Sequence, residues 1–148
     1  MASFQTFSRM FTVDEANDLL PSLRPLIERL FHNLGCLRRK SESVSREEKL
    51  APDSPDLMER LQEDGEIARL IQEVRGLVEE INSYGCVCKG VEEGLVDFPC
   101  LFGGEVVFLC WRYGEEKVGH WHRIQDGFAG RKPLLDLGEE SGGETSYH

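Results

Sequence analysis

The sequence contains no long run of apolar residues. No segment approaches the ~20 consecutive apolar residues that a membrane-spanning helix requires, and the first nine residues have no apolar core of the length found in signal peptides. Both absences argue against a membrane or secreted protein. We therefore expect a cytoplasmic protein that has no membrane partner.

The sequence also lacks an excess of basic residues. Its 148 residues include 17 Lys and Arg against 27 Asp and Glu, which gives a net charge of −10. Nucleic acids attract basic surfaces, so this balance predicts that no nucleic acid is a general partner. The basic cluster at residues 38–40 is soon followed by Glu42, Glu47 and Glu48.

The five cysteines lack the spacing of a disulfide framework or of a zinc ribbon. Their number is odd, and Cys86 and Cys88 are separated by one residue, where paired zinc ligands are usually separated by two. In a chain without a secretory signal, reduced and buried thiols are expected. Cys110, which lies near Arg112, is the one candidate nucleophile. No strand-to-helix nucleophile turn accompanies it, so cysteine catalysis is not expected.

The composition indicates one soluble domain. Hydrophobic residues make 40% of the chain and charged residues 30%, the usual balance of a globular protein. We predict a single α+β domain over residues 1–137, with a helical hairpin at 12–85 and a sheet at 86–134. Residues 138–148, rich in Gly, Glu and Ser, are predicted to form an acidic flexible tail.

The first helix begins at a capping box formed by Thr12 and Glu15. A stripe of leucines at helical spacing follows, from Leu19 to residue 37. Pro21 and Pro25 lie within it and predict either a kink near Leu20 or a short first helix that restarts there. Residues 40–55 are predicted to be a linker or a frayed helix end.

The second helix is predicted to begin at Ser54 and to end at Gly85. Its apolar stripe matches the first in length, so the two helices predict a long antiparallel hairpin. A small sheet covers only part of such a hairpin, and we therefore expect a homodimer that buries the rest of the stripe.

From residue 87 onward, β-branched and aromatic residues alternate with glycine turns. We predict one strand that ends near Phe102, a tight turn at residues 103–104, and further strands at residues 105–113 and 117–124. The second half of the chain is thus predicted to be a three- or four-stranded antiparallel β-meander.

His120 and His122 share one face of the last strand, because alternate residues of a strand point the same way. With an even-length turn before this strand, both histidines would share their face with Trp111. With an odd-length turn or a bulge at Gly114, they would lie beside Cys110. The second register would make His120, His122 and Cys110 candidate ligands of a divalent transition metal; the alternative is a hydrogen-bonded histidine without metal.

Residues 127–133 form a glycine-rich basic loop that is compatible with an anion-binding nest. The alternative, which we favour, has Phe128 in the core and Arg131 paired with Asp97 or Glu115. Asp97 interrupts an apolar strand, and a buried carboxylate requires a partner. An Asp–Arg or Asp–His pair beneath the sheet is therefore expected.

Residues 94–134 and the opening helix resemble the bacterial and archaeal domain-of-unknown-function family 2203. The resemblance extends over nearly the whole chain except the linker and the tail, and it implies no activity. It weighs against His120 as a ligand, because that position varies in the family pattern. That pattern commonly has acids soon after Trp-His, where this chain has Arg123 and Gln125. The pattern falls on Asp97, Cys110, Trp111, Gly114, Glu115, Trp121, His122, Gly127 and Arg131.

The leading functional hypothesis is a non-enzymatic ligand- or protein-binding module that acts as a dimer and needs no cofactor. The candidate binding residues are Asp97, Trp111, Glu115, Trp121, His122 and Arg131. The alternative is a metal-binding protein or metal-dependent enzyme that uses His122 with nearby carboxylates or Cys110. A third possibility is a structural partner of a larger assembly, acting through its helices.

Overall fold

The computed structural model describes residues 7–135. Three helices come first: α1 (Val13–Glu48), α2 (Pro55–Gln62) and α3 (Gly65–Asn82). Five strands follow: β1 (Val87–Gly90), β2 (Leu95–Phe102), β3 (Glu105–Arg112), β4 (His120–Arg123) and β5 (Lys132–Pro133), with a short 3-10 helix (Phe128–Gly130) before β5. The predicted α+β class is confirmed. The predicted tail at 138–148 lies outside the described residues.

Helix α1 is one continuous helix of 36 residues. The capping box is present, with Thr12 and Glu15 each accepting a hydrogen bond from the other's backbone amide at 2.9–3.0 Å. The helix passes through Pro21 and Pro25 without ending, because the leucines before, between and after them, Leu20, Leu23 and Leu26, are buried in the core and hold it in place. The predicted short first helix that restarts near Leu20 is therefore wrong.

Residues 40–55 were predicted to be a linker or a frayed helix end; a linker is wrong over most of this length, since α1 continues to Glu48 and α2 begins at Pro55. The second helix is also divided where a single helix was predicted. Asp64 accepts hydrogen bonds from the amides of Glu66 and Ile67 at 2.9 and 3.1 Å and so begins α3 as its N-cap. The apolar spacing continues across this break, and for that reason the stripe did not reveal it.

The five strands form one antiparallel sheet in the order β1-β2-β3-β4-β5, so each strand pairs with its neighbour in sequence. The predicted meander is confirmed, but it has five strands and not three or four. Gly103 and Gly104 form the turn between β2 and β3 with φ of 59° and 80°, which suits glycine at both positions. The strand predicted at residues 117–124 is the shorter β4, which begins at His120, three residues later than predicted.

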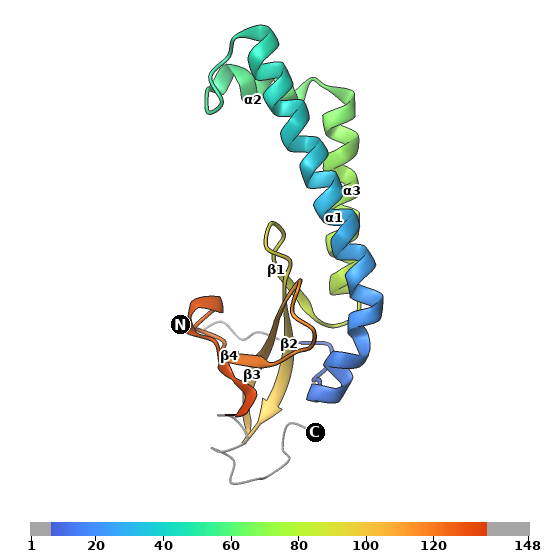
Figure 1. Cartoon of the computed structure of the whole chain (residues 1–148), viewed down its shortest axis with the longest axis vertical. Coiled ribbons are helices and arrows are strands. Elements are labelled where there is room, and N and C mark those ends of the chain that lie inside the picture. The colour runs from blue at the N-terminus through green and yellow to red at the C-terminus, as the bar shows by residue number, and fades with distance from the viewer. Residues whose placement is uncertain (1–6, 136–148) are drawn as a thin grey trace.

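The main core lies between one face of the sheet and the first half of α1. Figure 1 shows α1 and α3 side by side, with the sheet beside one part of α1 and the rest of α1 extending beyond it together with α2. The helices contribute the buried residues Leu20, Leu23, Leu26, Ile27, Leu30, Leu77 and Ile81, and the sheet contributes Val96, Phe98, Cys100, Val107, Leu109, Trp111 and Trp121.

Candidate functional site

The face of the sheet turned away from the helices carries a group of polar side chains. Strand partners that lie directly opposite share a face, and Asp97 on β2 is the partner of Cys110 on β3, which in turn is the partner of His120 on β4. The next pair along, Phe108 and His122, lies on the same face. Of the two predicted registers, the structure has the one that places Cys110 beside the histidines.

Asp97, Cys110 and His122 lie together at the centre of this face. Their potential ligand atoms are all within 4.8 Å of one another, and the three residues are only 3%, 1% and 2% exposed. His122 Nε2 is 3.0 Å from Asp97 Oδ2. The expected buried Asp–His pair is thus confirmed, and we refer to these three residues as the buried triad.

Both ring nitrogens of His122 are engaged. Nε2 faces Asp97, and Nδ1 is 2.7 Å from the carbonyl oxygen of Arg123, to which it donates. Burial by itself lowers the pKa of His122. Its interactions with Asp97, Cys110 and the backbone carbonyl outweigh burial and raise the pKa from 6.5 to about 10. At neutral pH the triad therefore contains an imidazolium paired with a carboxylate.

A second ion pair, Glu115 with Arg131, borders the buried triad. Arg131 donates two hydrogen bonds to the Glu115 carboxylate, at 3.2 and 2.6 Å. Burial raises the pKa of Glu115, but the bonds from Arg131 and from the Arg112 amide lower it more. Burial lowers the pKa of Arg131, whereas its interactions with Glu115 and Cys110 raise it. Glu115 also lies 3.8 Å from Nδ1 of His120, the strand partner of Cys110, so the two ion pairs form one continuous polar cluster.

The position of Glu115 depends on the turn after β3. Gly114 has a φ of 106°, a conformation that favours glycine, and it brings Glu115 back toward Arg112. The Glu115 side chain accepts a hydrogen bond from the Arg112 amide at 2.9 Å, while its carbonyl accepts one from the indole nitrogen of Trp111 at 3.0 Å. The turn thus aims the Glu115 carboxylate at Arg131.

Not every candidate residue lies in the polar cluster. Trp111 and Trp121 are on the opposite face of the sheet, 0% and 2% exposed, within the main core. His120 lies at the edge, with Nδ1 3.8 Å from a Glu115 oxygen. Phe128 is 37% exposed, so the expectation that it fills the core is wrong; the guanidinium of Arg131 instead lies over its ring at 4.4 Å.

Two aromatic residues that the sequence reasoning missed enclose the buried triad. Phe108, 1% exposed, lies two residues before Cys110 on the same face of β3 and contacts the ring of His122, with centroids 5.5 Å apart. Phe7 packs edge-on against Phe108, also at 5.5 Å. The alternation of β3 places Phe108 on the face of Cys110, but no local pattern points to Phe7.

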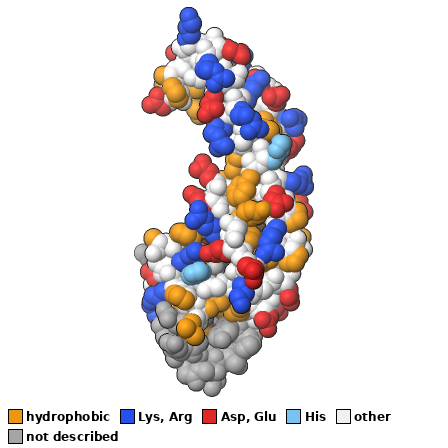
Figure 2. Space-filling view, in the orientation of Figure 1, with side chains coloured by type: hydrophobic (Ala, Val, Ile, Leu, Met, Phe, Trp, Pro, Cys, Tyr) orange, Lys and Arg blue, Asp and Glu red, His pale blue; other side chains and the backbone are white. Residues whose placement is uncertain are grey.

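A second candidate surface lies on the helices beyond the sheet. We call residues 37–48 of α1, all of α2 and residues 65–71 of α3 the distal arm. A groove of about 320 Å³ lies between these helices, and we call it the distal groove; its lining residues are Leu37, Ser41, Met58, Leu61, Gln62, Ile67 and Ile71. Met58 is 56% exposed and Ile71 38%. Figure 2 shows hydrophobic side chains at the far end of the molecule among charged ones.

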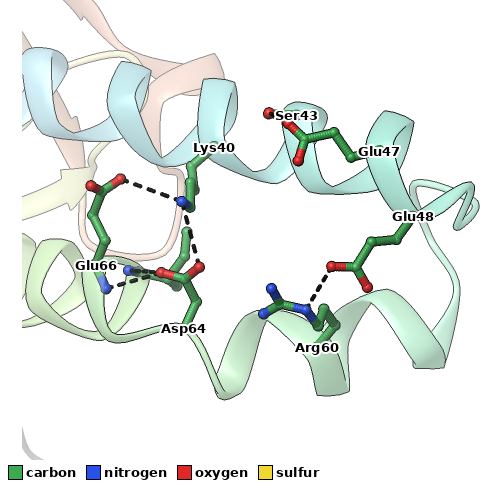
Figure 3. A network of polar contacts seen from close by, with 8 residues as sticks. Lys40, Ser43, Glu47, Glu48, Arg60, Asp64 and Glu66 are labelled. Atoms are coloured by element: carbon green, nitrogen blue, oxygen red, sulfur yellow. Dashed lines mark hydrogen bonds and ion pairs between the residues drawn. The ribbon is translucent and has the colours of Figure 1, made fainter.

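Ion pairs fasten the distal arm together. Figure 3 shows Lys40 on α1 reaching Asp64 at 3.5 Å and Glu66 at 3.9 Å, and Arg60 on α2 reaching Glu48 at 2.7 Å. The pKa of Asp64 is lowered, first by the hydrogen bond from the Ile67 amide and then by the charge of Lys40. These contacts join α1 to α2 and to the first turn of α3.

Within residues 7–135, each helix is either too short or too polar to span a lipid bilayer. The profile of one protein family, described as "Uncharacterized conserved protein (DUF2203)", matches residues 9–134. Neither a curated protein nor a solved structure matches the chain.

Proposed function

The chain belongs to this family of uncharacterized conserved proteins, and we propose that it is a non-enzymatic protein-binding module that acts as a homodimer through the distal groove. The observation that carries the proposal is the groove itself, an apolar surface on helices that the sheet does not reach. Its occupant is the same groove of a second copy.

The difference in length between α1 and the sheet explains why the distal groove is open. Helix α1 has 36 residues and is about 54 Å long at ~1.5 Å per residue. The longest strands have eight residues and span about 26 Å at ~3.3 Å per residue. The sheet therefore covers about half of α1, and the core formed with it contains no fully buried α1 residue beyond Leu30.

Beyond the sheet, the distal arm has too few elements to enclose its own apolar side chains. Val44, Leu57, Ile67 and Leu70 are buried between the three helices. Leu37, Met58, Leu61 and Ile71 then line the open side. The two longer helices, α1 and α3, form a partial bundle with the short α2. A second copy would supply two more long helices and complete it in the manner of a four-helix bundle.

A second copy suits this surface better than a strongly charged partner. The chain carries a net charge of −10, which opposes self-association. Three of the acidic side chains near the groove, Glu48, Asp64 and Glu66, are however already paired within the chain, so these three oppose a second copy less than free carboxylates do. A two-fold axis would place Met58 against its counterpart, and the flexible methionine side chain adapts readily to such a contact.

Sedimentation velocity over a range of protein concentrations tests the proposal. We expect the wild type to be a dimer, and the Met58→Glu/Ile71→Glu double variant to be a monomer, because four glutamates would face one another across the two-fold axis. The matched control is Leu101→Glu/Ile124→Glu, since Leu101 on β2 and Ile124 in the turn after β4 are both exposed away from the groove and the change in charge is the same. A wild type that is monomeric at every concentration, or equal dissociation of the control, would refute the proposal.

A further inference from the structure

We propose that the buried triad, Asp97, Cys110 and His122, binds one transition-metal ion of the zinc type. This site is separate from the distal groove and does not depend on dimerisation. The proposal rests on three different donor types that come from three adjacent strands and meet in one buried place.

The strands hold the three donors rigidly. Asp97 and Cys110 are direct partners across β2 and β3, and His122 follows on β4, so the backbone hydrogen bonds of the sheet fix all three positions. Zinc binds sulfur at ~2.3 Å and nitrogen or oxygen at ~2.0–2.2 Å, which puts the ligands of a tetrahedral site about 3.3–3.6 Å apart. The donor atoms lie within 4.8 Å of one another, so side-chain rotations bring them to that separation without a change of the strands.

The hydrogen bond of His122 to the backbone prepares its ring for a metal. A ligating histidine typically donates its other ring N–H to a carbonyl or a carboxylate, which fixes the orientation of the ring. His122 Nδ1 donates to the Arg123 carbonyl at 2.7 Å, and Nε2 is turned toward Asp97 and Cys110. A metal at Nε2 would replace the bond to Asp97 and keep the bond to the backbone.

The donor set selects the class of metal. Thiolate and imidazole favour zinc and neighbouring transition metals, whereas Mg²⁺ and Ca²⁺ require oxygen ligands. A divalent ion with the Asp97 carboxylate and the Cys110 thiolate is neutral overall, and the adjacent Glu115–Arg131 pair is neutral as well. Charges in a site this deeply buried need such compensation.

The environment of Cys110 distinguishes it from the other buried cysteines. Cys86 and Cys100 lie in the main core, where burial raises the pKa of each thiol, to about 12 and about 11. Cys110 instead lies on the polar face, with its sulfur within 4.8 Å of a ligand atom of Asp97 and of His122. Of the cysteines that the structure describes, it is the one with two further potential metal ligands beside it.

Titration of untagged, metal-free protein with Co²⁺ tests the site. We expect one Co²⁺ per chain, with a thiolate-to-cobalt charge-transfer band in the near ultraviolet, displaced by Zn²⁺. Because coordination removes protons from its ligands, the affinity should rise with pH. The same result is expected with the Met58→Glu/Ile71→Glu variant, so a failure of the dimer proposal would not affect this one.

Two buried cysteines on opposite faces of the sheet supply a matched pair of variants. Cys110→Ala should abolish the charge-transfer band, while Cys100→Ala, at a position equally buried, should keep it. Asp97→Asn and His122→Gln should each weaken Co²⁺ binding by more than the about 10- to 100-fold that loss of an outer partner costs.

X-ray absorption at the metal edge of the wild-type complex makes the test independent of whether the variants fold. We expect one sulfur neighbour together with nitrogen or oxygen neighbours. A folded wild type with no thiolate band at saturating Co²⁺, a band that persists in Cys110→Ala, or a first shell without sulfur would overturn the proposal. In each of these cases the triad would be an ion pair and a thiol that serve the fold alone.

Discussion

In the distal arm, Arg60 and Glu48 form an ion pair while their side chains are 37% and 39% exposed; on the sheet, His122 and Asp97 form one at 2% and 4% exposure. The arm pair joins residues 12 apart in sequence, and the sheet pair joins residues 25 apart. Water screens the first pair, whereas the second must be satisfied entirely by protein groups. The arm is therefore held by many weak local contacts around an open apolar groove, and the sheet by a few buried polar contacts that tolerate little change.

Replacing Asp97 with alanine should have the largest effect on stability. The change leaves the His122 imidazolium buried without its carboxylate, and breaking one side of a buried pair costs about 3–5 kcal/mol. Urea denaturation in the presence of a chelator measures this free energy without a metal contribution. A loss of less than 1 kcal/mol would show that the pair is solvated and that the contrast between sheet and arm is wrong.

The dependence of stability on pH should also separate the two regions. The pKa of His122 is raised from 6.5 to about 10 in the folded protein, so its contribution is fully present below pH 6.5 and is lost as the pH rises toward 10. One proton gives a slope of at most about 1.4 kcal/mol per pH unit.

The comparison of wild type with His122→Gln, both metal-free, isolates this slope, because the remaining groups titrate in both proteins. Denaturation free energies measured from pH 6 to pH 10 should converge between the two as the pH rises. Parallel curves would mean that His122 does not carry the proton in the folded state.

The smallest effect is expected for Glu48→Gln in the distal arm. The change removes an exposed ion pair with Arg60, and such pairs contribute about 0–1 kcal/mol. Added salt should reduce even this difference. The same urea denaturation measures this free energy. A loss as large as that of Asp97→Ala would show that the ion pairs of the two regions contribute equally to stability.

Local features of the sequence were sufficient for much of the fold. The capping box at Thr12 and Glu15 began the first helix where predicted, and Gly103 and Gly104 marked the turn of the β2–β3 hairpin. Each depends on residues within three or four positions of one another. The break at Asp64 also has a local signal, a cap residue followed by glycine, but the apolar spacing across it favoured the single helix that was predicted.

The site was predictable in its members but not in its arrangement. The residues Asp97, Cys110 and His122 stood out by type, and the need of a buried carboxylate for a partner predicted an Asp–His or Asp–Arg pair. Which face Cys110 occupied depended on the length of the connection to β4, and two registers were open. Trp111 and Trp121 were expected beside the polar cluster, yet the pleat of the sheet places them on the helical face.

By itself, the sequence determined that helices precede strands, where α1 begins and where β2 turns into β3, because caps, turns and apolar spacing act between near neighbours. Only the tertiary structure decided that α1 continues through two prolines, since buried side chains around Leu20 and Leu23 outweigh the local cost. It also decided the register that gathers the buried triad and leaves the distal groove open. The register depends on the connection between β3 and β4, and the open groove depends on how far the sheet reaches along α1; both bring together surfaces that are distant in sequence.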